Sequence, residues 1–272
     1  MTTFAAAKCP NCNGELQVPN DRNSVRCMYC SGEVIVRQAV LAAASGNPEN
    51  WIKLGNAAMK AGNHQEAIAN FNKVLEVDPN NWEAWLKKAE STGWLSNLSD
   101  CRLGEMVSHL RQGIACAPKE GLQELKELAA DSINDVATAY NNLACQHLRQ
   151  FITVDRVWPE FIEQTAAAFD ALEAAHQFDP KNNAVLRNIV TILTGLIQGV
   201  AYNDRDLYGR LTRRVHRIKP DYALKMTVMK QEYETKLKQL DPSYQAREVK
   251  KAKVGAGWTI LSILRLFNAT RF

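Results

Sequence analysis

The sequence has no hydrophobic run long enough to cross a membrane. The longest apolar stretch, from Asn188 to Tyr202, is interrupted by Thr191, Thr194 and Gln198. It is shorter than the ~20 apolar residues that a membrane-spanning helix needs, so we expect a buried helix here. The first residues, MTTFAAAKCP, also lack the basic start and long apolar segment of a secretory signal. We therefore expect a cytoplasmic protein without disulfide bonds.

The sequence also lacks the short motifs of common enzyme active sites. It has no H-E-x-x-H pair, phosphate-binding loop or nucleophile elbow. Its five histidines are scattered, at His64, His109, His147, His176 and His216. Three cysteines, Cys101, Cys116 and Cys145, belong to no motif, and we expect them to be small buried side chains. We predict that the protein is not an enzyme.

The other four cysteines form a motif near the N-terminus. Cys9 and Cys12 make one C-x-x-C pair, and Cys27 and Cys30 make a second pair fourteen residues later. This spacing is typical of a tetrahedral zinc site held by two tight turns. The segments ELQV and EVIV have the composition of short strands, with turn residues PNDRNS between them. The motif therefore predicts a zinc ribbon with one structural Zn²⁺, because four thiolates leave no coordination position for a substrate.

Two other readings of these cysteines find less support. A redox pair usually needs an exposed thiolate at a helix N-terminus within a βαβ unit, which this stretch does not supply. A nucleic-acid-binding ribbon would be basic and rich in aromatics, but acidic residues nearly balance the basic ones here, and Tyr29 is the one aromatic between residues 8 and 37. Nucleic acid is not the partner that we expect for the ribbon.

The segment PENWIKLGNAAMKAGNHQEAIANFNKVLEVDPNN, residues 48–81, resembles a tetratricopeptide repeat (TPR). The pattern W-x2-L-G, A-x3-F and terminal Pro is met by Trp51, Leu54, Gly55, Ala67, Phe71 and Pro79, and Ala58 replaces its tyrosine. The resemblance implies an antiparallel helix pair in which small Gly55 and Ala67 permit close approach. Trp51, Leu54 and Phe71 are expected to fill the space between the helices.

Weaker matches extend this pattern along the chain. A second pair is expected from Trp82 to Pro118, and a third contains AYNNLACQHL and TAAAFDALEAAHQF, with extra residues that require longer helices. A fourth pair is expected from Asn183 to Pro220. Five prolines are expected to follow helix ends: Pro79, Pro118, Pro180, Pro220 and Pro242. The predicted fold class is mainly α, a right-handed solenoid of antiparallel TPR-like helix pairs with a small N-terminal β zinc ribbon.

The predicted domains follow one another in a simple order. They are a zinc ribbon (1–37), a linker (38–47), TPR-like repeats (48–220), a C-terminal helical extension (221–254) and an apolar amphipathic tail (255–272). This arrangement is similar to that of a group of bacterial proteins in which a zinc ribbon precedes TPR-like repeats. The resemblance implies a non-enzymatic adaptor or scaffold that binds a protein or peptide client.

The client would bind along the first helices of the pairs. This peptide-binding face is predicted to comprise Ile52, Asn56, Met59, Lys60, Leu86, Lys87 and Glu90. We exclude the carboxylate clamp of some such repeats, because Ile52 stands where its lysine would be. A solvated helix face without a client is the alternative reading.

The C-terminal third is strongly basic. Residues 205–272 contain 16 lysines and arginines against 6 acidic residues, a net charge of +10. Arg210, Arg213, Arg214 and Arg217 recur at spacings of three and four, which predicts one side of a helix over residues 205–220. This side is either solvated or an anion site for an acidic protein segment, a phosphate-bearing lipid or nucleic acid.

The final segment is basic and then apolar. Lys250, Lys251 and Lys253 precede a glycine hinge. The large apolar residues that follow are Trp258, Ile260, Leu261, Ile263, Leu264, Leu266 and Phe267. Such a segment does not stay free in water. It either docks on the array or a partner, lies on an anionic membrane surface, or mediates self-association. A peripheral membrane or nucleic-acid-associated protein is therefore the alternative function.

Overall fold

The computed structural model describes residues 4–9, 11–12, 14–19, 23–36, 47–246, 248–250 and 252. The chain divides into two compact units, residues 1–91 and 92–272. The predicted apolar tail, and the predicted linker apart from Asn47, lie outside the described residues.

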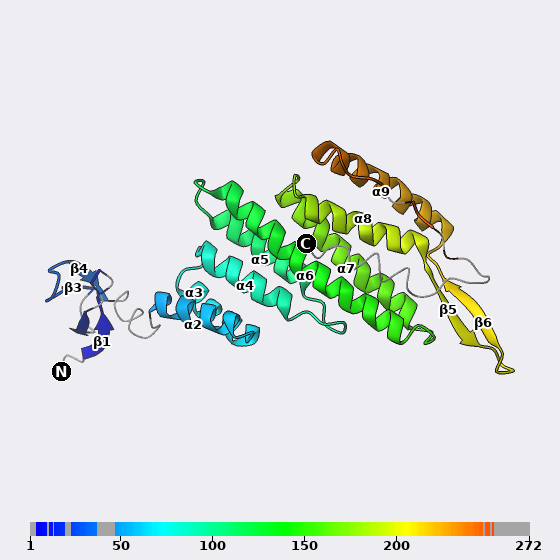
Figure 1. The fold of residues 1–272 in the computed structure, drawn as a ribbon. Helices are drawn as coiled ribbons and strands as arrows, with labels where there is room; N and C mark the ends of the chain where they lie inside the picture. Colours follow the sequence, from blue (N-terminus) through cyan, green and yellow to red (C-terminus); the bar gives the residue numbers. More distant parts are fainter. Residues whose placement is uncertain are drawn as a thin grey trace. The chain divides into compact units, whose positions relative to one another are not determined.

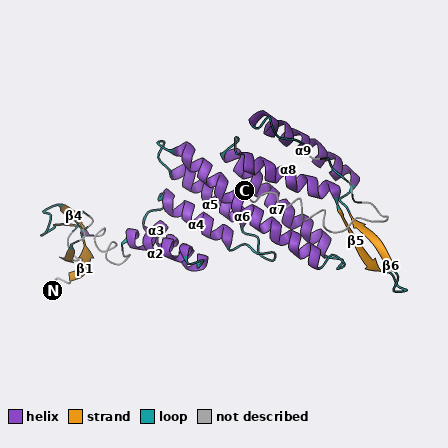
Figure 2. Ribbon diagram, viewed as in Figure 1, coloured by secondary structure: helices purple, strands orange, loops and turns teal. Residues whose placement is uncertain are grey.

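The ribbon in the first unit consists of two antiparallel hairpins (Figure 2). Strand β1 (Phe4–Lys8) pairs with β2 (Glu15–Pro19), and β3 (Ser24–Arg26) pairs with β4 (Glu33–Ile35). The two predicted strand segments are thus confirmed, but β1 was not expected, because its sequence FAAAK is mostly alanine and has little β propensity. The small core contains Ala7, Cys9, Leu16, Val18, Cys27, Val34 and Val36.

The first unit continues with helices α2 (Pro48–Lys60) and α3 (His64–Val77), and most of α4 (Trp82–Trp94) also belongs to it. Asn63 caps α3, because its Oδ1 accepts from the Glu66 N–H while its Nδ2 donates to the Glu66 carboxylate at 2.7 Å. A Cβ added to Gly55 of α2 would lie 2.6 Å from the Phe71 ring, so glycine permits the predicted close approach. Leu54 departs from the prediction, since its side chain is 55% exposed.

The second unit is a stack of helices (Figure 1). They are α5 (Leu103–Cys116), α6 (Leu122–Gln150), α7 (Val157–Phe178), α8 (Asn183–Gln198) and α9 (Pro220–Leu240). Each helix packs against the next along the chain. In addition, α5 contacts α7, and α6 contacts α8. These neighbour and next-neighbour contacts are those of a helical repeat solenoid. As expected from the extra residues, α6 and α7 are unusually long.

The predicted fourth helix pair, over Asn183 to Pro220, is wrong. Strands β5 (Val200–Arg205) and β6 (Leu211–His216) form an antiparallel hairpin where a helix was expected, and α8 pairs with α9 instead. Gly199, with a φ of 67°, ends α8, and Gly209, with a φ of 75°, closes the hairpin turn. Pro220, which was predicted to follow a helix end, is instead the first residue of α9. The missing N–H of proline is not needed at that position of a helix.

Three helices end in the same Asp-Pro turn. Asp78, Asp179 and Asp241 follow α3, α7 and α9, and each carboxylate accepts a hydrogen bond from the backbone N–H two residues later at 3.0 to 3.1 Å. Because α9 ends as α3 and α7 do, it has the closing turn of a repeat's second helix. The boundary that we predicted between repeats and extension, near residue 220, remains a prediction.

The predicted buried helix within the longest apolar run is confirmed as α8. Nine of its residues are buried, among them Leu186, Ile189 and Leu193. The helix ends at Gln198, and the run continues into β5. Among the described helices, none combines the length and the apolar character that crossing a bilayer requires.

Candidate functional site

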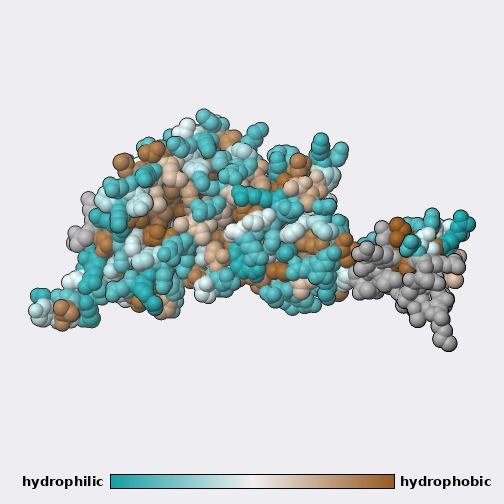
Figure 3. Space-filling model, turned by 180° about the vertical axis from the view of Figure 1, so that it is seen from behind, coloured by the Kyte–Doolittle hydropathy of each residue, from teal (hydrophilic) through white to brown (hydrophobic). Residues whose placement is uncertain are grey.

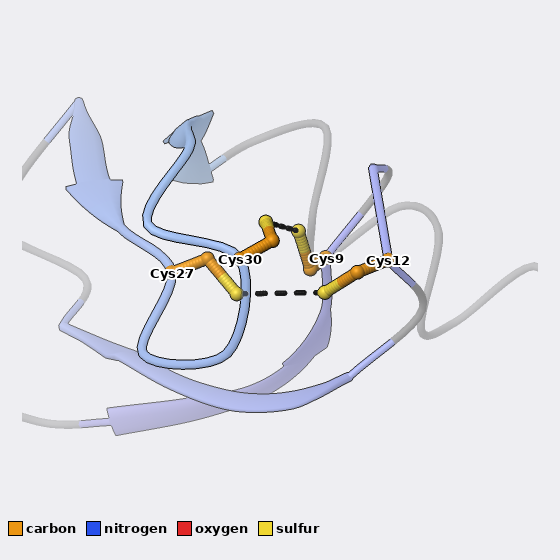
Figure 4. A group of neighbouring side chains, drawn as sticks. All are labelled: Cys9, Cys12, Cys27 and Cys30. Carbon is orange, nitrogen blue, oxygen red and sulfur yellow. Dashed lines mark hydrogen bonds between the residues drawn. The ribbon is translucent and has the colours of Figure 1, made fainter.

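The cysteine pairs lie in the turns of the two ribbon hairpins (Figure 4). The two turns are alike. The N–H of the first cysteine donates to a glycine carbonyl five residues later, from Cys9 to Gly14 and from Cys27 to Gly32, both at 2.9 Å. In each pair the first cysteine is buried and the second is exposed. The ribbon therefore presents two equivalent knuckles with pseudo-twofold symmetry.

Each knuckle also packs on the glycine of the other. A Cβ added to Gly14 would lie 2.5 Å from the Tyr29 ring, and one added to Gly32 would lie 2.8 Å from the Asn11 amide. Asn11 and Tyr29 occupy the same position in their C-x-x-C sequences. A glycine two residues after the second cysteine of each pair thus leaves space for the opposite knuckle. Ser31, the residue between Cys30 and Gly32, has a φ of 60°.

The four sulfurs have the spacing of a tetrahedral metal site. All ligand atoms of Cys9, Cys12, Cys27 and Cys30 lie within 4.8 Å of one another. The Sγ atoms of Cys9 and Cys30, and those of Cys12 and Cys27, are 3.7 Å apart. Thiolates ~2.3 Å from a tetrahedral zinc ion would be about 3.8 Å apart, whereas a disulfide needs about 2 Å. The cysteines can therefore hold a metal ion.

The thiols of the cluster differ in how readily they ionise. Backbone N–H groups of Cys30 and Tyr29, together with hydrogen bonds from neighbouring thiols, lower the pKa of Cys27 to about 6, although burial opposes them. At Cys12 the Gly14 N–H lowers the pKa, but partial loss of solvation and hydrogen bonds with the other three thiols raise it overall, to about 12. A second negative sulfur is unfavourable beside the first, so a central cation is what would allow all four to be thiolates.

No other group of metal-binding side chains of this kind occurs among the described residues. His147 contacts the Phe151 ring, His176 contacts the Tyr233 ring, and His216 stacks on Trp158 and Tyr202. These three histidines therefore take part in packing. Of the isolated cysteines, Cys145 is buried as expected, Cys116 is half-buried, and Cys101 is exposed, contrary to expectation.

The predicted peptide-binding residues lie on α2 and α4, but they differ in accessibility. Ile52 and Met59 pack against the core cluster around Phe71, so they help to hold the repeat together. Lys60 is exposed, and Asn56 and Leu86 are half-buried. The Lys87 Nζ lies 3.6 Å from the Glu90 carboxylate. The role of these residues in client binding stays a prediction.

The four predicted anion-binding arginines do not share a helix face. Arg213 and Arg214 are consecutive on β6 and so point to opposite sides of the hairpin, while Arg210 and Arg217 lie beyond its two ends. The Arg210 Nε lies 2.9 Å from Asp206, and the Arg214 Nη1 lies 3.1 Å from Asp204. The spacing of three and four was misleading because arginine occurs on both faces of the strand. The turn residues Asp206 and Gly209, between two β-prone stretches, were the signal for a hairpin.

A comparison with protein families agrees with the predicted repeat. Residues 48–81 match the tetratricopeptide repeat family. Among solved structures, the chain is similar to one described as "Crystal structure of MamA protein", with 13% sequence identity and a TM-score of 0.27 over 74% of this chain and 97% of that chain. Among curated proteins, no relative matches the sequence. The family match supports a role in protein interactions for the first helix pair.

Proposed function

We propose that the protein is a non-enzymatic cytoplasmic adaptor whose TPR-like array binds a protein or peptide partner. The observation that carries this proposal is the TPR match over residues 48–81, which form a packed helix pair, and the helices from α5 to α9 also pack on one another. A repeat array offers a long surface for a partner and contributes no chemistry of its own. The proposed contact surface is the accessible part of α2 and α4, namely Asn56, Lys60, Leu86, Lys87 and Glu90.

Capture of a partner by full-length protein from nuclease-treated lysate tests this surface. We expect one protein to be retained in stoichiometric amount. The double variant Lys60→Glu, Lys87→Glu should reduce its recovery roughly tenfold or more, because the two new carboxylates would repel the acidic groups of a partner that binds these lysines. The matched control is Lys119→Glu with Lys181→Glu, two exposed lysines of the second unit. Equal recovery by the α2 and α4 variant and the control would contradict the proposed surface.

We also propose that the ribbon binds one structural Zn²⁺ through Cys9, Cys12, Cys27 and Cys30. A set of four thiolates at tetrahedral spacing suits zinc and leaves no coordination position open for a reaction. A reducing cytoplasm would keep such thiols available. The bound ion would supply folding energy to the ribbon and no catalysis.

Elemental analysis of full-length protein purified without added metal tests the zinc proposal. We expect one zinc per chain, and a loss of zinc in the Cys9→Ser, Cys27→Ser variant. Cys101→Ser with Cys116→Ser is the control, because these cysteines lie outside the cluster. Another metal in stoichiometric amount, or zinc retained after loss of two ligands, would contradict the proposal.

A further inference from the structure

The β5–β6 hairpin is held at its base and exposed along its outer half. The His216 ring stacks on Trp158 of α7 with centroids 5.3 Å apart and on Tyr202 of β5 at 4.6 Å. The His216 Nε2 also lies 3.0 Å from the Ile152 carbonyl oxygen. All of residues 207–211 are exposed, and the hairpin extends beyond the ends of the helices of its unit (Figure 1).

The exposed turn is ordered around one carboxylate. Asp206 accepts hydrogen bonds from the Tyr208 and Arg210 N–H groups, both at 2.9 Å, and from the Arg210 side chain at 2.9 Å. Its own N–H donates to the Arg210 carbonyl at 2.9 Å. The turn therefore holds its two central side chains, Leu207 and Tyr208, in a defined outward position.

These two side chains make the hairpin tip apolar. Leu207 is 101% exposed and Tyr208 is 82% exposed, and nearby Leu211 is 68% exposed. The space-filling view shows hydrophobic residues at the far end of this projection (Figure 3). Scattered exposed apolar side chains are ordinary, but here they cluster on a rigid projection, which favours a surface that buries them.

The hairpin is also basic, and nearly all of its positive charge comes from arginine. Residues 200–219 contain five arginines and one lysine against two aspartates, although the whole chain has 17 lysines and 16 arginines. Both aspartates already pair within the hairpin, Asp204 with Arg214 and Asp206 with Arg210. The hairpin therefore carries a net positive charge beside its apolar tip, which suits an acidic partner.

Arg205 is an exposed arginine whose guanidinium is held against the turn. Its Nη1 donates to the Gly209 carbonyl at 2.8 Å, and the strand register places Arg205 opposite Leu211. Within the part of the chain that the structure describes, Arg205 forms no ion pair. Arginine has five N–H donors in a planar fork that fits a carboxylate. Arg205 is therefore placed to receive a carboxylate beside the apolar tip.

We propose that the hairpin is a second docking surface, which binds an acidic segment of a partner protein that also carries large apolar side chains. Leu207 and Tyr208 pack on the apolar side chains of this segment, and Arg205 pairs with one of its carboxylates. Tyrosine and arginine are enriched among the residues that dominate protein interfaces. Because the turn already orders these side chains, binding costs little conformational entropy. The surface uses none of the residues proposed on α2 and α4.

A lipid surface and nucleic acid fit the hairpin less well. The tip offers one small apolar anchor, and a single weak anchor gives only marginal membrane binding. Anionic headgroups attract lysine as well as arginine, so a membrane does not account for the excess of arginine. Nucleic acid would stack its bases on aromatic rings, but the Arg210 guanidinium already lies over the Tyr208 ring at 5.1 Å.

Selection from a random library of short peptides displayed on phage tests this surface. The library is first depleted on the Leu207→Ser, Arg205→Gln variant and then selected on full-length protein, which removes peptides that bind elsewhere. We expect the retained peptides to combine aspartate or glutamate with large apolar residues, and their binding to weaken in high salt. Recovery of no peptide, or of peptides without acidic residues, would overturn the proposal.

Fluorescence anisotropy with one retained peptide then measures the separate contacts. We expect Leu207→Ser to weaken binding roughly tenfold, as for burial of most of a leucine side chain. Arg205→Gln should weaken it roughly tenfold as well, because a charged hydrogen bond is lost. Changing the paired peptide carboxylate to its amide should weaken binding to the original protein but have little further effect on Arg205→Gln. Additive effects for every acidic position of the peptide would contradict the pairing.

Matched variants elsewhere are the controls. Leu128→Ser removes a leucine that is 64% exposed on α6, and Lys181→Gln removes an exposed charge, so both should bind the peptide as the original protein does. The Lys60→Glu, Lys87→Glu variant should also bind it unchanged. Failure of the hairpin surface is thereby distinguished from failure of the partner surface on α2 and α4.

Three other ligands of the tip are outcomes of the same test. Flotation with vesicles of phosphatidylcholine and phosphatidylglycerol that is lost in Leu207→Ser would assign the tip to a membrane. An oligonucleotide that binds more tightly than the peptide and requires Arg205 would assign it to nucleic acid. Oligomers of the protein alone that Leu207→Ser dissociates would assign it to a second copy. Each of these results would overturn the proposal.

Discussion

At the scale of single residues, the packing of the two ribbon knuckles depends on two glycines, which have no side chain. Gly14 and Gly32 leave room for Tyr29 and Asn11 of the opposite knuckle. The knuckle turn then requires a left-handed backbone at Ser31, the only non-glycine residue with a positive φ among the described residues. The ribbon thus combines close contact between its two knuckles with a strained backbone at Ser31.

Replacing Ser31 with glycine should therefore stabilise the ribbon. A left-handed conformation costs a residue with a Cβ about 1 kcal/mol, and glycine avoids this cost. Competition with a chromophoric chelator should show tighter zinc retention for Ser31→Gly. The neighbouring change Gly32→Ala should have the opposite effect, because its Cβ would meet the Asn11 amide. Weaker zinc retention in Ser31→Gly would contradict this account of the turn.

The first helix pair provides a second test at this scale. Gly55→Ala would place a Cβ 2.6 Å from the Phe71 ring and should lower the free energy of unfolding by about 1 to 3 kcal/mol. Gly104→Ala on α5 meets no atom within 4 Å and should be neutral or raise it by up to about 1 kcal/mol. Urea denaturation followed by circular dichroism measures both. Equal effects of the two changes would show that packing on Phe71 is unimportant.

At the scale of elements, the ribbon hairpins are too small to fold on their own packing. Among the described residues, their core contains seven buried side chains, two of which are cysteines of the cluster, with Val25 packed against them. Burial of so little apolar surface does not offset the entropy of ordering the chain, so the proposed zinc ion would supply the remaining folding energy.

Removal of zinc with a strong chelator should therefore unfold residues 8–37 and leave the helices intact. We expect amide exchange to become fast in β2, β3 and β4, while the helical circular dichroism signal stays nearly unchanged. Readdition of zinc should restore protection. Protection of these strands after complete metal removal would contradict the prediction.

Prediction from sequence was successful for elements that are marked by a periodic pattern of residues or by a motif with fixed spacing. The cysteine spacing located both knuckles, and the W-x2-L-G pattern located α2 and α3. It was wrong over residues 205–220, because arginines at spacings of three and four also occur in a strand whose two faces are both partly exposed to water. It also predicted that Leu54 fills the space between the two helices, whereas Leu54 is 55% exposed. The family pattern does not show which side chains pack within a repeat and which ones a neighbouring repeat would cover.

At the scale of the whole molecule, α9 belongs to the stack. Leu237 is fully buried, and the Tyr233 hydroxyl donates to the Glu173 carboxylate of α7. Arg187 of α8 pairs with Asp241 in the turn that ends α9. A detached extension would make no such contacts, so the second unit has α9 as its last helix within the described residues.

Truncation of Leu237 tests this arrangement. Leu237→Ala should lower the free energy of unfolding of the second unit by about 2 to 5 kcal/mol, since it leaves a cavity where a fully buried side chain stood. Leu224→Ala, on the same helix but 68% exposed, should change it by less than about 0.5 kcal/mol. Thermal unfolding measures both variants. A small effect of Leu237→Ala would mean that α9 is not part of the cooperative stack.

The sequence alone located the four cysteines that can hold a metal ion and the first repeat, because their geometry follows from local spacing. A spacing of two residues between cysteines is enough to form a knuckle, and a 34-residue repeat is enough to form a helix pair, independently of the rest of the fold. The tertiary structure decided the partner of α8, the hairpin inserted before α9, and the contact between Arg217 and Ala252 at the base of that hairpin. These depend on contacts between distant segments, which local periodicity does not encode.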